Sequence, residues 1–301
     1  MEVISILIPT YNAEPYIEKL ILNLMSQELK KDQQIEIIIF DSSSSDQTVD
    51  IVRKKFFNVK VNIIAKEDFD HGRTRNLLAS QAKGTYLLFM TQDALPCDHR
   101  LLATLVEPFC DPNVMISYAR QVPYENTPLL EKFARNYNYP EVSVMKDKRS
   151  IQFLGIKVFF NSDACSMYRK TGFEELGGFQ EGIIQNEDMI FASKVILNDY
   201  IVSYTAGAKV YHSHQYTLKQ QFKRYFDTGR AFKQMEFIFK YVSNEKEGFK
   251  MLQKQLIYLI LLRKYHLIPF ALFETIVKFA AYHLGKRSDI YHSKSKFYRH
   301  I

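Results

Sequence analysis

The feature that most constrains the fold of this chain is a repeated alternation of apolar runs and helix-like segments near its start. The apolar runs have the length and composition of buried strands in a parallel sheet. They lie at residues 3–9, 35–40, 61–65 and 85–90. Helical patterns occupy residues 14–27, 47–56 and 71–83. This strand-helix order requires right-handed crossovers, so it predicts an α/β fold with a mainly parallel sheet.

Polar side chains follow three of these apolar runs at the point where each predicted strand ends. They are Thr10 and Asn12 after the first run, Asp41 after the second, and Thr91, Gln92 and Asp93 after the last. A single Asp after a strand is usually a helix cap or a turn residue. The carboxyl ends of parallel strands, however, meet at one edge of a sheet, where ligands bind in α/β folds. The convergence of three polar sites at that edge is the first indication of function.

Composition narrows the class of protein. At 301 residues the chain is long enough for one large domain or two small ones. Its hydrophobic content of 47% excludes a disordered class. The formal charge of +7 favours partners that carry phosphates or form an anionic surface. Three cysteines lack metal-type spacing and no signal peptide precedes the first run, so we expect reduced thiols in the cytoplasm.

The loop after the second run contains four consecutive serines at residues 42–45. It would present hydroxyl and backbone N–H groups at the sheet edge, where they could hold a nucleotide. It lacks the Gly and Lys of a P-loop, and no G-x-G-x-x-G follows any predicted strand, which weakens a dinucleotide hypothesis.

Two arginines, Arg73 and Arg75, open the helix predicted at residues 71–83. Cations at a helix N-terminus oppose the helix dipole unless an anion offsets them. Surface salt bridges to nearby acids such as Asp68 or Asp70 would do so, and so would a bound phosphate or sugar. The sequence leaves both interpretations open.

The middle of the chain, residues 101–160, is interrupted by prolines, and its apolar residues show no clear helical or strand period. We expect a helix at residues 128–138 and strands at residues 151–160, with Gly155 marking a bulge or turn. Asp163 follows an aromatic pair, and Gly178 lies in a turn whose backbone can approach another group closely.

A strong helical pattern begins at Asn186-Glu187-Asp188. Acidic residues in a first helical turn usually complement the dipole. Two short strands, at residues 200–204 and 208–211, then run into His212 and His214. Two histidines flanking a serine after a strand are as compatible with metal ligands as with a structural role.

From Thr217 onward the pattern is helical and cationic. Residues 255–262 and 267–284 are apolar, but charges interrupt or flank both, and neither is a clean span of about 20 residues. We expect a pair of amphipathic helices on an anionic membrane surface, or alternatively in a homo-oligomer interface. The cations expected to face lipid are Lys286, Arg287, Lys294, Lys296 and Arg299. No nucleic-acid-binding motif is present, so nucleic acid is not an expected partner.

Together these residues resemble family 2 of the inverting glycosyltransferases, which have the GT-A fold, a Rossmann-like sheet flanked by helices. The resemblance covers about residues 3–215. Its landmarks are Ile8-Pro9-Thr10-Tyr11-Asn12, the loop at residues 41–46, Thr91-Gln92-Asp93, Gly177-Gly178-Phe179, Asn186-Glu187-Asp188 and a final histidine. Residues 69–76, the Thr91-Gln92-Asp93 form of the acidic motif and residues 267–278 are similar to the bacterial rhamnosyltransferase branch.

For the donor, the resemblance implies that Asp41 contacts the base of the nucleotide, with Thr10 and Asn12 beside it. It implies that Arg75 and Asn76 lie near the ribose and the phosphates.

Two further donor contacts are expected from Gln92 and Arg224. Gln92 lies inside the acidic motif. Arg224 belongs to Gln221-x-x-Arg224-Tyr225, which is similar to a Gln-x-x-Arg-Trp motif of processive relatives but has Tyr in place of Trp.

For the metal, Asp93 matches the second acid of the D-x-D motif, whereas Thr91 replaces the first. The loss of one carboxylate puts metal dependence in question. His212 or His214 matches an imidazole ligand of many relatives and could compensate, which would suit Mn²⁺ or Mg²⁺.

For catalysis, Asp188 matches the general base of the family, which the reaction needs because an acceptor hydroxyl is a poor nucleophile until its proton is removed. Glu187, Asp163 and Gly178 are expected to support the base or the acceptor.

The resemblance thus implies transfer of L-rhamnose from dTDP-L-rhamnose to a lipid-linked saccharide, at the inner face of the cell membrane. Residues 1–215 would form the catalytic domain and residues 216–301 a helical appendage peripheral to the membrane. A UDP-hexose or UDP-N-acetylhexosamine donor, a non-catalytic nucleotide-sugar-binding protein and a nucleotidyltransferase are the alternatives. The nucleotidyltransferase is disfavoured because it would need a Gly-rich phosphate loop after the first strand.

Overall fold

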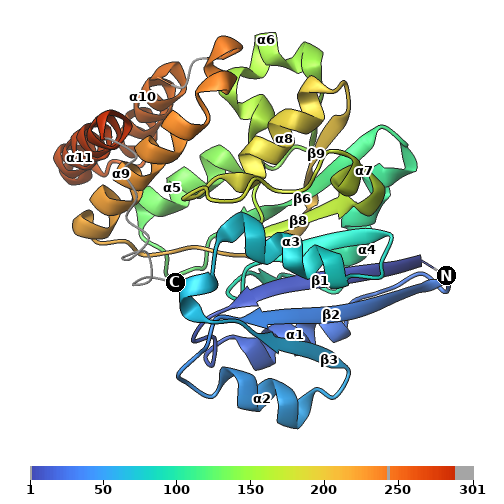
Figure 1. Ribbon diagram of the computed structural model, residues 1–301. Coiled ribbons are helices and arrows are strands. Elements are labelled where there is room, and N and C mark those ends of the chain that lie inside the picture. The colour runs from blue at the N-terminus through green and yellow to red at the C-terminus, as the bar shows by residue number, and fades with distance from the viewer. Residues whose placement is uncertain (1, 243–244, 289–301) are drawn as a thin grey trace.

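The structure, a computed structural model, describes residues 2–242 and 245–288, and it has one mixed sheet with helices packed on both faces (Figure 1). The strands are β1 (Glu2–Thr10), β2 (Gln33–Asp41), β3 (Val59–Ile63), β4 (Tyr86–Met90), β5 (Leu95–Pro96), β6 (Val114–Val122), β7 (Val144–Lys146), β8 (Cys165–Arg169) and β9 (Ile201–Tyr211). The helices are α1 (Ile17–Met25), α2 (Thr48–Lys55), α3 (His71–Gln81), α4 (Leu101–Val106), α5 (Leu129–Asn138), α6 (Ile151–Leu154), α7 (Lys170–Glu175), α8 (Glu187–Leu197), α9 (Leu218–Gln234), α10 (Glu245–Leu261) and α11 (Ile268–Arg287).

The strand order is β3-β2-β1-β4-β8-β6-β9-β5, and β7 also pairs with β9. The first four strands are parallel, as the alternating sequence pattern predicts. The remainder is mixed, because β8 runs antiparallel to both β4 and β6. This returning strand brings the loop that precedes it, residues 161–164, to the carboxyl end of β4.

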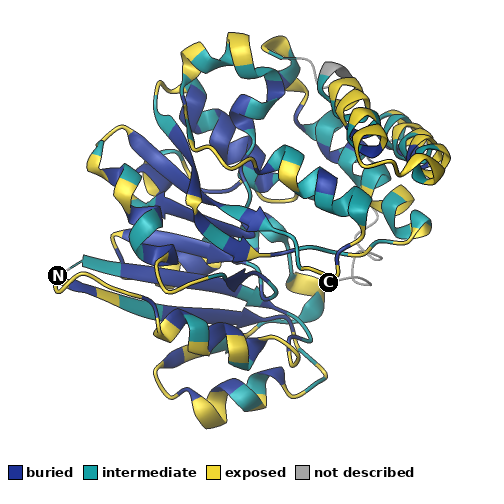
Figure 2. Cartoon of the chain, turned by 180° about the vertical axis from the view of Figure 1, so that it is seen from behind, coloured by how far each residue is buried: buried dark blue, intermediate teal, exposed yellow. Residues whose placement is uncertain are grey.

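The core consists of two apolar layers, one on each face of the sheet. Side chains alternate along β1, so that Leu7 joins one layer while Ile6 and Ile8 join the other. Helices α3 and α8 cover the first layer, and α1, α2 and α4 cover the second. Figure 2 shows the strands as the most buried part of the chain. The two layers fix the strands, and therefore fix the loops that leave their ends.

Two predictions in the middle of the chain are wrong. Residues 151–160 form the short helix α6 and the 3-10 turn η4 (Gly155–Phe159), not strands. Asp147 accepts a hydrogen bond from the backbone of Ser150 in a capping box, which starts helical geometry just before this segment. Gly155 does mark a turn, with φ of +55°. The strands expected at residues 200–204 and 208–211 are one strand, β9, whose pairing with β6 contains an irregularity.

Three helices follow the sheet. A capping box between Thr217 and Gln220 starts α9, and α11 lies along α9 in a parallel orientation. Two glycines permit this close approach: a Cβ on Gly229 would collide with the backbone carbonyl of Tyr282, and a Cβ on Gly285 with that of Phe226. Lys294, Lys296 and Arg299, which we expected to face lipid, lie outside the described residues.

The packing of α9 on α11 can be tested with Gly229→Ala. Helix propensity alone favours Ala over Gly by about 1 kcal/mol. The collision with the α11 backbone should instead make the substitution destabilising, by about 1–3 kcal/mol of unfolding free energy. Denaturant or thermal unfolding measures the change.

Gly248→Ala in α10 is the matched control, because nothing lies within 4 Å of a Cβ at that position. It should leave stability unchanged or raise it by up to about 1 kcal/mol. If Gly229→Ala stabilises the protein as much as Gly248→Ala does, α9 and α11 do not pack as described.

Candidate active site

Asp41 and Thr10 are neighbours at the ends of adjacent parallel strands, β2 and β1. The Thr10 hydroxyl donates to Asp41 Oδ2 at 2.8 Å, and the backbone N–H of Ser44 donates to Oδ1 at 2.7 Å. Asp41 is completely buried. Its carboxylate therefore holds the serine loop in place by accepting hydrogen bonds from Ser44, and the loop covers Asp41 at this edge of the sheet.

Asn12 and Gln92 tie the next two loops to that surface. Asn12 has a positive φ of 49°, and its side-chain oxygen accepts from the backbone N–H of Ser45 at 2.9 Å. The side chain of Gln92 makes two hydrogen bonds to the backbone of Tyr11. Its oxygen accepts from the Tyr11 N–H at 2.9 Å, and its nitrogen donates to the Tyr11 carbonyl at 3.1 Å. The loop after β1 is thereby fixed to the residue that precedes Asp93.

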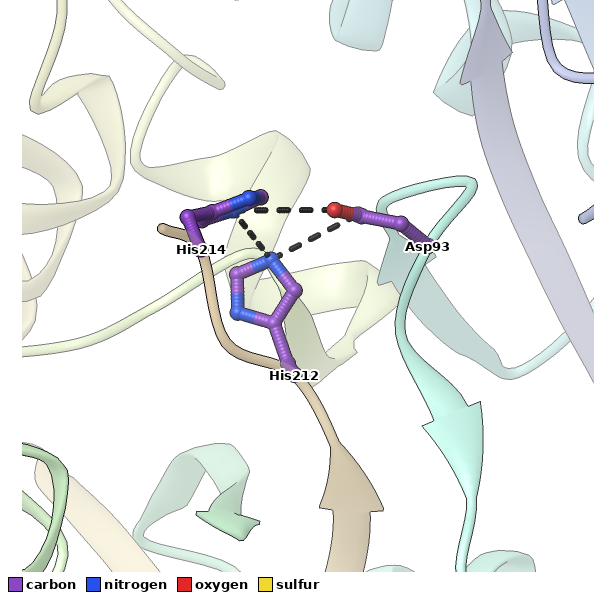
Figure 3. Close-up of side chains that lie close together, drawn as sticks. All are labelled: Asp93, His212 and His214. Atoms are coloured by element: carbon purple, nitrogen blue, oxygen red, sulfur yellow. Dashed lines mark hydrogen bonds and ion pairs between the residues drawn. The ribbon is translucent and has the colours of Figure 1, made fainter. Parts of the chain in front are cut away.

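Asp93, His212 and His214 converge at the carboxyl end of β4 and the end of β9 (Figure 3). The Nε2 atom of His212 lies 3.4 Å and that of His214 lies 3.6 Å from the carboxylate oxygens of Asp93. The two Nε2 atoms are 3.0 Å apart. One ligand atom from each residue thus lies within 4.8 Å of the others, which is close enough for all three to hold one metal ion.

The protonation states of these groups suit a divalent cation. Burial alone would raise the pKa of Asp93, but hydrogen bonding and charge from His212 and His214 hold it below its usual range. Burial and the adjacent His212 lower the pKa of His214 to about 4. An ionised carboxylate and a neutral imidazole are the forms that bind metal, so the donor set fits Mn²⁺ or Mg²⁺ despite Thr91.

A second layer of residues orients His212. The side-chain oxygen of Gln121 accepts from Arg135 and lies 2.8 Å from His212 Nδ1. Because that oxygen can only accept, the Nδ1–H group of His212 donates to it, and this contact fixes the orientation of the ring beside Asp93. Neither Gln121 nor Arg135 was expected from the sequence, because neither lies in a motif. The pairing of β6 with β9 brings Gln121 to His212, and Arg135 reaches Gln121 from α5.

Arg224 lies beside the same cluster. Its guanidinium donates to the hydroxyl of Tyr216 at 2.7 Å, and the Tyr216 ring packs against His214. The charges of Arg135 and Arg224 both act to lower the pKa of His214. Two cations thus lie near the three candidate ligands, where they would attract an anionic ligand.

Asp188 belongs to a buried acidic cluster at the start of α8. Its Oδ2 accepts from the backbone N–H of Asp163 at 3.1 Å. Arg75 Nη1 lies 2.9 Å from Glu187, and Arg75 Nε lies 3.3 Å from Asp163. Arg75, Asp163 and Glu187 are each at most 5% exposed, whereas Asp188 retains partial solvent access.

One guanidinium therefore faces three carboxyl groups, and their pKa values diverge. Burial acts to raise the pKa of Glu187, but the charges of Arg75 and His71 and a backbone hydrogen bond together lower that pKa. Burial raises the pKa of Asp163 well above its usual range. Burial and then the charge of Glu187 raise the pKa of Asp188 to about 7. Asp188 is thus the member that can exchange a proton near neutral pH.

Arg75, Asn76 and Gly178 have protein partners in this structure. The side chain of Asn76 accepts from the backbone N–H of Phe179 and donates to its carbonyl, both at 2.9 Å. Gly178 has φ of +64°, and a Cβ there would press on Asn76, which accounts for the close backbone approach expected at this turn. These residues hold α3 against the loop that leads to α8.

A chain of contacts joins the two clusters. Gln121, which orients His212, donates to the Ser162 hydroxyl at 2.8 Å, and the next residue, Asp163, donates to Asp188. On the other side, Gln92 links Asp93 to the loop after Thr10 and hence to Asp41. The site residues lie at the open carboxyl edge of the sheet, and none of them lines the cavity of about 790 Å³ between α6 and α10.

Comparison with known proteins identifies the family of this chain. The model of the family described as Glycosyl transferase family 2 matches residues 5–177, which is more than half of the chain. Among curated proteins, the O-antigen chain rhamnosyltransferase RfbN of Salmonella typhimurium is 38% identical over 285 residues, covering 94% of this chain and 89% of the relative. The O-antigen chain rhamnosyltransferase WbaN of Salmonella anatum is 37% identical with the same coverage.

Solved structures share the fold. A mannosyltransferase, PcManGT from Pyrobaculum calidifontis in complex with GDP-Man and Mn²⁺, superposes with a TM-score of 0.60 at 19% identity, over 92% of this chain and 74% of that one. Residues 1–349 of TarS from Staphylococcus aureus, in complex with UDP-GlcNAc, give a TM-score of 0.55 at 17% identity, over 95% and 90%. The predicted GT-A fold is confirmed. The chain belongs to glycosyl transferase family 2, and it is a glycosyltransferase.

Proposed function

We propose that this enzyme is an inverting rhamnosyltransferase, which moves L-rhamnose from dTDP-L-rhamnose to a hydroxyl of a lipid-linked saccharide during synthesis of a cell-surface polysaccharide. The observation that carries the proposal is the alignment of 94% of the chain with two proteins named O-antigen chain rhamnosyltransferases. A lipid-linked acceptor implies action at the cytoplasmic face of the membrane, with residues 216–301 as a helical appendage to the catalytic residues 1–215.

Asp188 is the general base in this proposal. Its partial exposure lets an acceptor hydroxyl reach it, and its raised pKa of about 7 suits a group that takes up a proton at neutral pH. The acceptor oxygen attacks the anomeric carbon as its proton passes to Asp188, and the bond from that carbon to the diphosphate oxygen breaks. A single displacement inverts the anomeric centre, so a β-linked donor gives an α-rhamnoside.

Asp93, His212 and His214 would hold Mn²⁺ or Mg²⁺. Such an ion supplies positive charge against the departing diphosphate. Arg135 and Arg224 border the same three residues and would add to that charge, which stabilises the leaving group as its negative charge develops.

For the nucleotide, we propose that the loop supported by Asp41, Thr10 and Asn12 receives the base. Gln92 fixes this loop relative to Asp93. We assign Arg75 a different role from the donor contact expected from sequence: it holds Glu187 and Asp163 around Asp188.

Asn76 and Gly178 support the same loop-helix junction by packing against each other. Their effect on the acceptor is thus indirect, through the position of α8.

A UDP-sugar donor is the second candidate. TarS, a poly(ribitol-phosphate) β-N-acetylglucosaminyltransferase of Staphylococcus aureus, is 26% identical over 69% of this chain, and its UDP-GlcNAc complex shares the fold. Because this chain covers only 35% of that relative, the rhamnosyl assignment is favoured.

The donor can be tested by isothermal titration with dTDP-L-rhamnose, UDP-glucose and UDP-N-acetylglucosamine in the presence of Mn²⁺. We expect the dTDP-sugar to bind at least about tenfold more tightly, a difference of about 1.4 kcal/mol. Binding of a UDP-sugar with no detectable binding of dTDP-L-rhamnose would replace the first assignment with the second.

The base can be tested with Asp188→Asn. Loss of a general base should lower the transfer rate about 10²–10⁴-fold, while donor affinity is retained. Asp50→Asn, at an exposed position in the first turn of α2, is the control and should leave the rate unchanged. An Asp188→Asn enzyme that transfers sugar at the wild-type rate would exclude this role.

The pH dependence of kcat supplies an independent test of the same group. Asp188 must be ionised to accept a proton, and its pKa is raised to about 7. Activity should therefore fall as the pH drops through about 7, and the fall should be absent from the residual activity of Asp188→Asn. A rate that stays constant down to about pH 5, as an unperturbed Asp of pKa about 4 would give, contradicts the assignment.

A further inference from the structure

The outward faces of α10 and α11 expose an unusual amount of apolar surface. Six large side chains define what we call the α10–α11 face: Ile257, Leu261, Leu272, Phe273, Ile276 and Phe279. Each is exposed, and Figure 2 shows that much of both helices is exposed. A soluble helix normally turns polar residues outward, and contiguous exposed apolar surface marks an interaction site.

Helix α11 distributes its residues differently from the surface helix of a soluble protein: its large apolar side chains point outward and small residues point inward. Its inward face consists largely of small residues, Ala271, Ala281 and Gly285, which let α9 approach closely. Its outward face carries Ile276 and Phe279, which are 64% and 63% exposed. These large apolar side chains are thus left exposed in the folded chain, and together they mark an interaction surface.

Charge indicates what that environment is. Over α10 and α11, residues 245–287, the sequence has eight Lys and Arg residues and three acids, Glu245, Glu247 and Glu274. Glu247 pairs with Lys157. Glu274 is buried and pairs with Gln221 and with Lys278. Arg263 and Lys264 are exposed at the tip of the helical hairpin, beside the apolar face.

An apolar face with a cationic rim fits an anionic lipid surface. A second copy of this chain fits less well, because a symmetric contact would bring the two cationic rims together.

Residues 265–287 are also long and apolar enough to cross a membrane. The packing of α9 argues against a span. Helix α9 carries charges along its length, including Lys223, Asp227 and Lys233, and it contacts α11 from Glu274 to Ser288. Burying α11 in a bilayer would bury α9 beside it, at a cost of several kcal/mol per charged side chain. The helix must therefore lie along the surface.

We propose that α10 and α11 form a monotopic membrane-binding surface, which inserts its apolar face between the headgroups of anionic phospholipids. The inference deepens the proposed function, since it rests on a lipid-linked acceptor for its purpose. Helix α9 joins the two parts: Gln221 contacts α11, while Arg224 contacts Tyr216 beside His214. Helix α9 thus connects the catalytic edge to the helix that would face the lipid.

The test is co-sedimentation of the full chain with vesicles, without donor or acceptor. We expect binding to vesicles of phosphatidylcholine mixed with phosphatidylglycerol, and much weaker binding to phosphatidylcholine alone. Raising the salt concentration should weaken it. Arg263→Gln and Lys264→Gln should each lower affinity roughly fivefold, because each cation contributes about 1 kcal/mol near an anionic surface.

The double substitution Ile276→Glu and Phe279→Glu should lower vesicle affinity at least about tenfold. Both side chains are exposed, so its unfolding temperature and donor binding should match those of the wild type. Phe57→Glu is the matched control: Phe57 is 87% exposed, follows α2 at the far end of the molecule (Figure 1), and should not affect vesicle binding.

Three results would overturn the proposal: no binding of the wild type to anionic vesicles, an equal loss in Phe57→Glu, or a wild-type dimer that the double substitution converts to a monomer. The last would assign the face to a second copy. Because donor binding is measured separately, a failure here leaves the glycosyltransferase assignment intact, and a wrong donor leaves vesicle binding intact.

Discussion

The structure of the site depends on one buried cation, the guanidinium of Arg75. It pairs with Glu187 at the start of α8 and with Asp163 before β8, and so joins three segments that are far apart in the sequence. Removing one partner from a buried ion pair typically costs about 3–5 kcal/mol, because the remaining charge is left unpaired. Asp188, beside this pair, receives little of the positive charge. The same burial that locks Arg75 to its partners therefore leaves Asp188 with a pKa near neutrality.

Much of this arrangement is predictable from sequence. The apolar runs that end in polar residues indicated where the carboxyl edge of the sheet lies. Strands that alternate with helices are parallel, so their carboxyl ends meet at the same edge. The two histidines after β9 and Asp93 after β4 were expected at one place, and the structure brings both imidazoles to the carboxylate. The convergence could be predicted because each residue lies within three residues of the end of a strongly patterned strand. That these residues bind a metal stays a prediction.

Other features depend on contacts that local patterns do not encode. The sequence allowed Arg75 either a surface salt bridge or a ligand. The structure instead buries it with acids about 90 and 110 residues away, as only the return of β8 beside β4 makes possible. Gln121 reaches His212 through the pairing of β6 with β9, and Arg135 reaches Gln121 from α5, so these contacts too join segments that are far apart in the sequence. Residues 151–160 were misjudged because their helical start depends on the Asp147 cap rather than on a period of apolar residues.

The packing of the C-terminal helices also depends on which residues occupy each helix face. Small residues on α9 and α11 pack against each other, which leaves the large apolar residues outward. Helix α9 also places Arg224 near His214, so in the proposed function its position would affect both the contact with a membrane and the charge around the donor diphosphate. A lipid-linked acceptor would then approach Asp188 from a fixed direction relative to the donor.

The central claim is that Asp93, His212 and His214 hold the diphosphate end of a donor whose sugar faces Asp188. The most direct measurement is a crystal structure with dTDP and Mn²⁺, in which anomalous scattering locates the ion. The account predicts one Mn²⁺ bound to Asp93 and at least one of the two imidazoles, with the diphosphate between it and Arg135 or Arg224. A Mn²⁺–nucleotide complex bound away from these residues would contradict it.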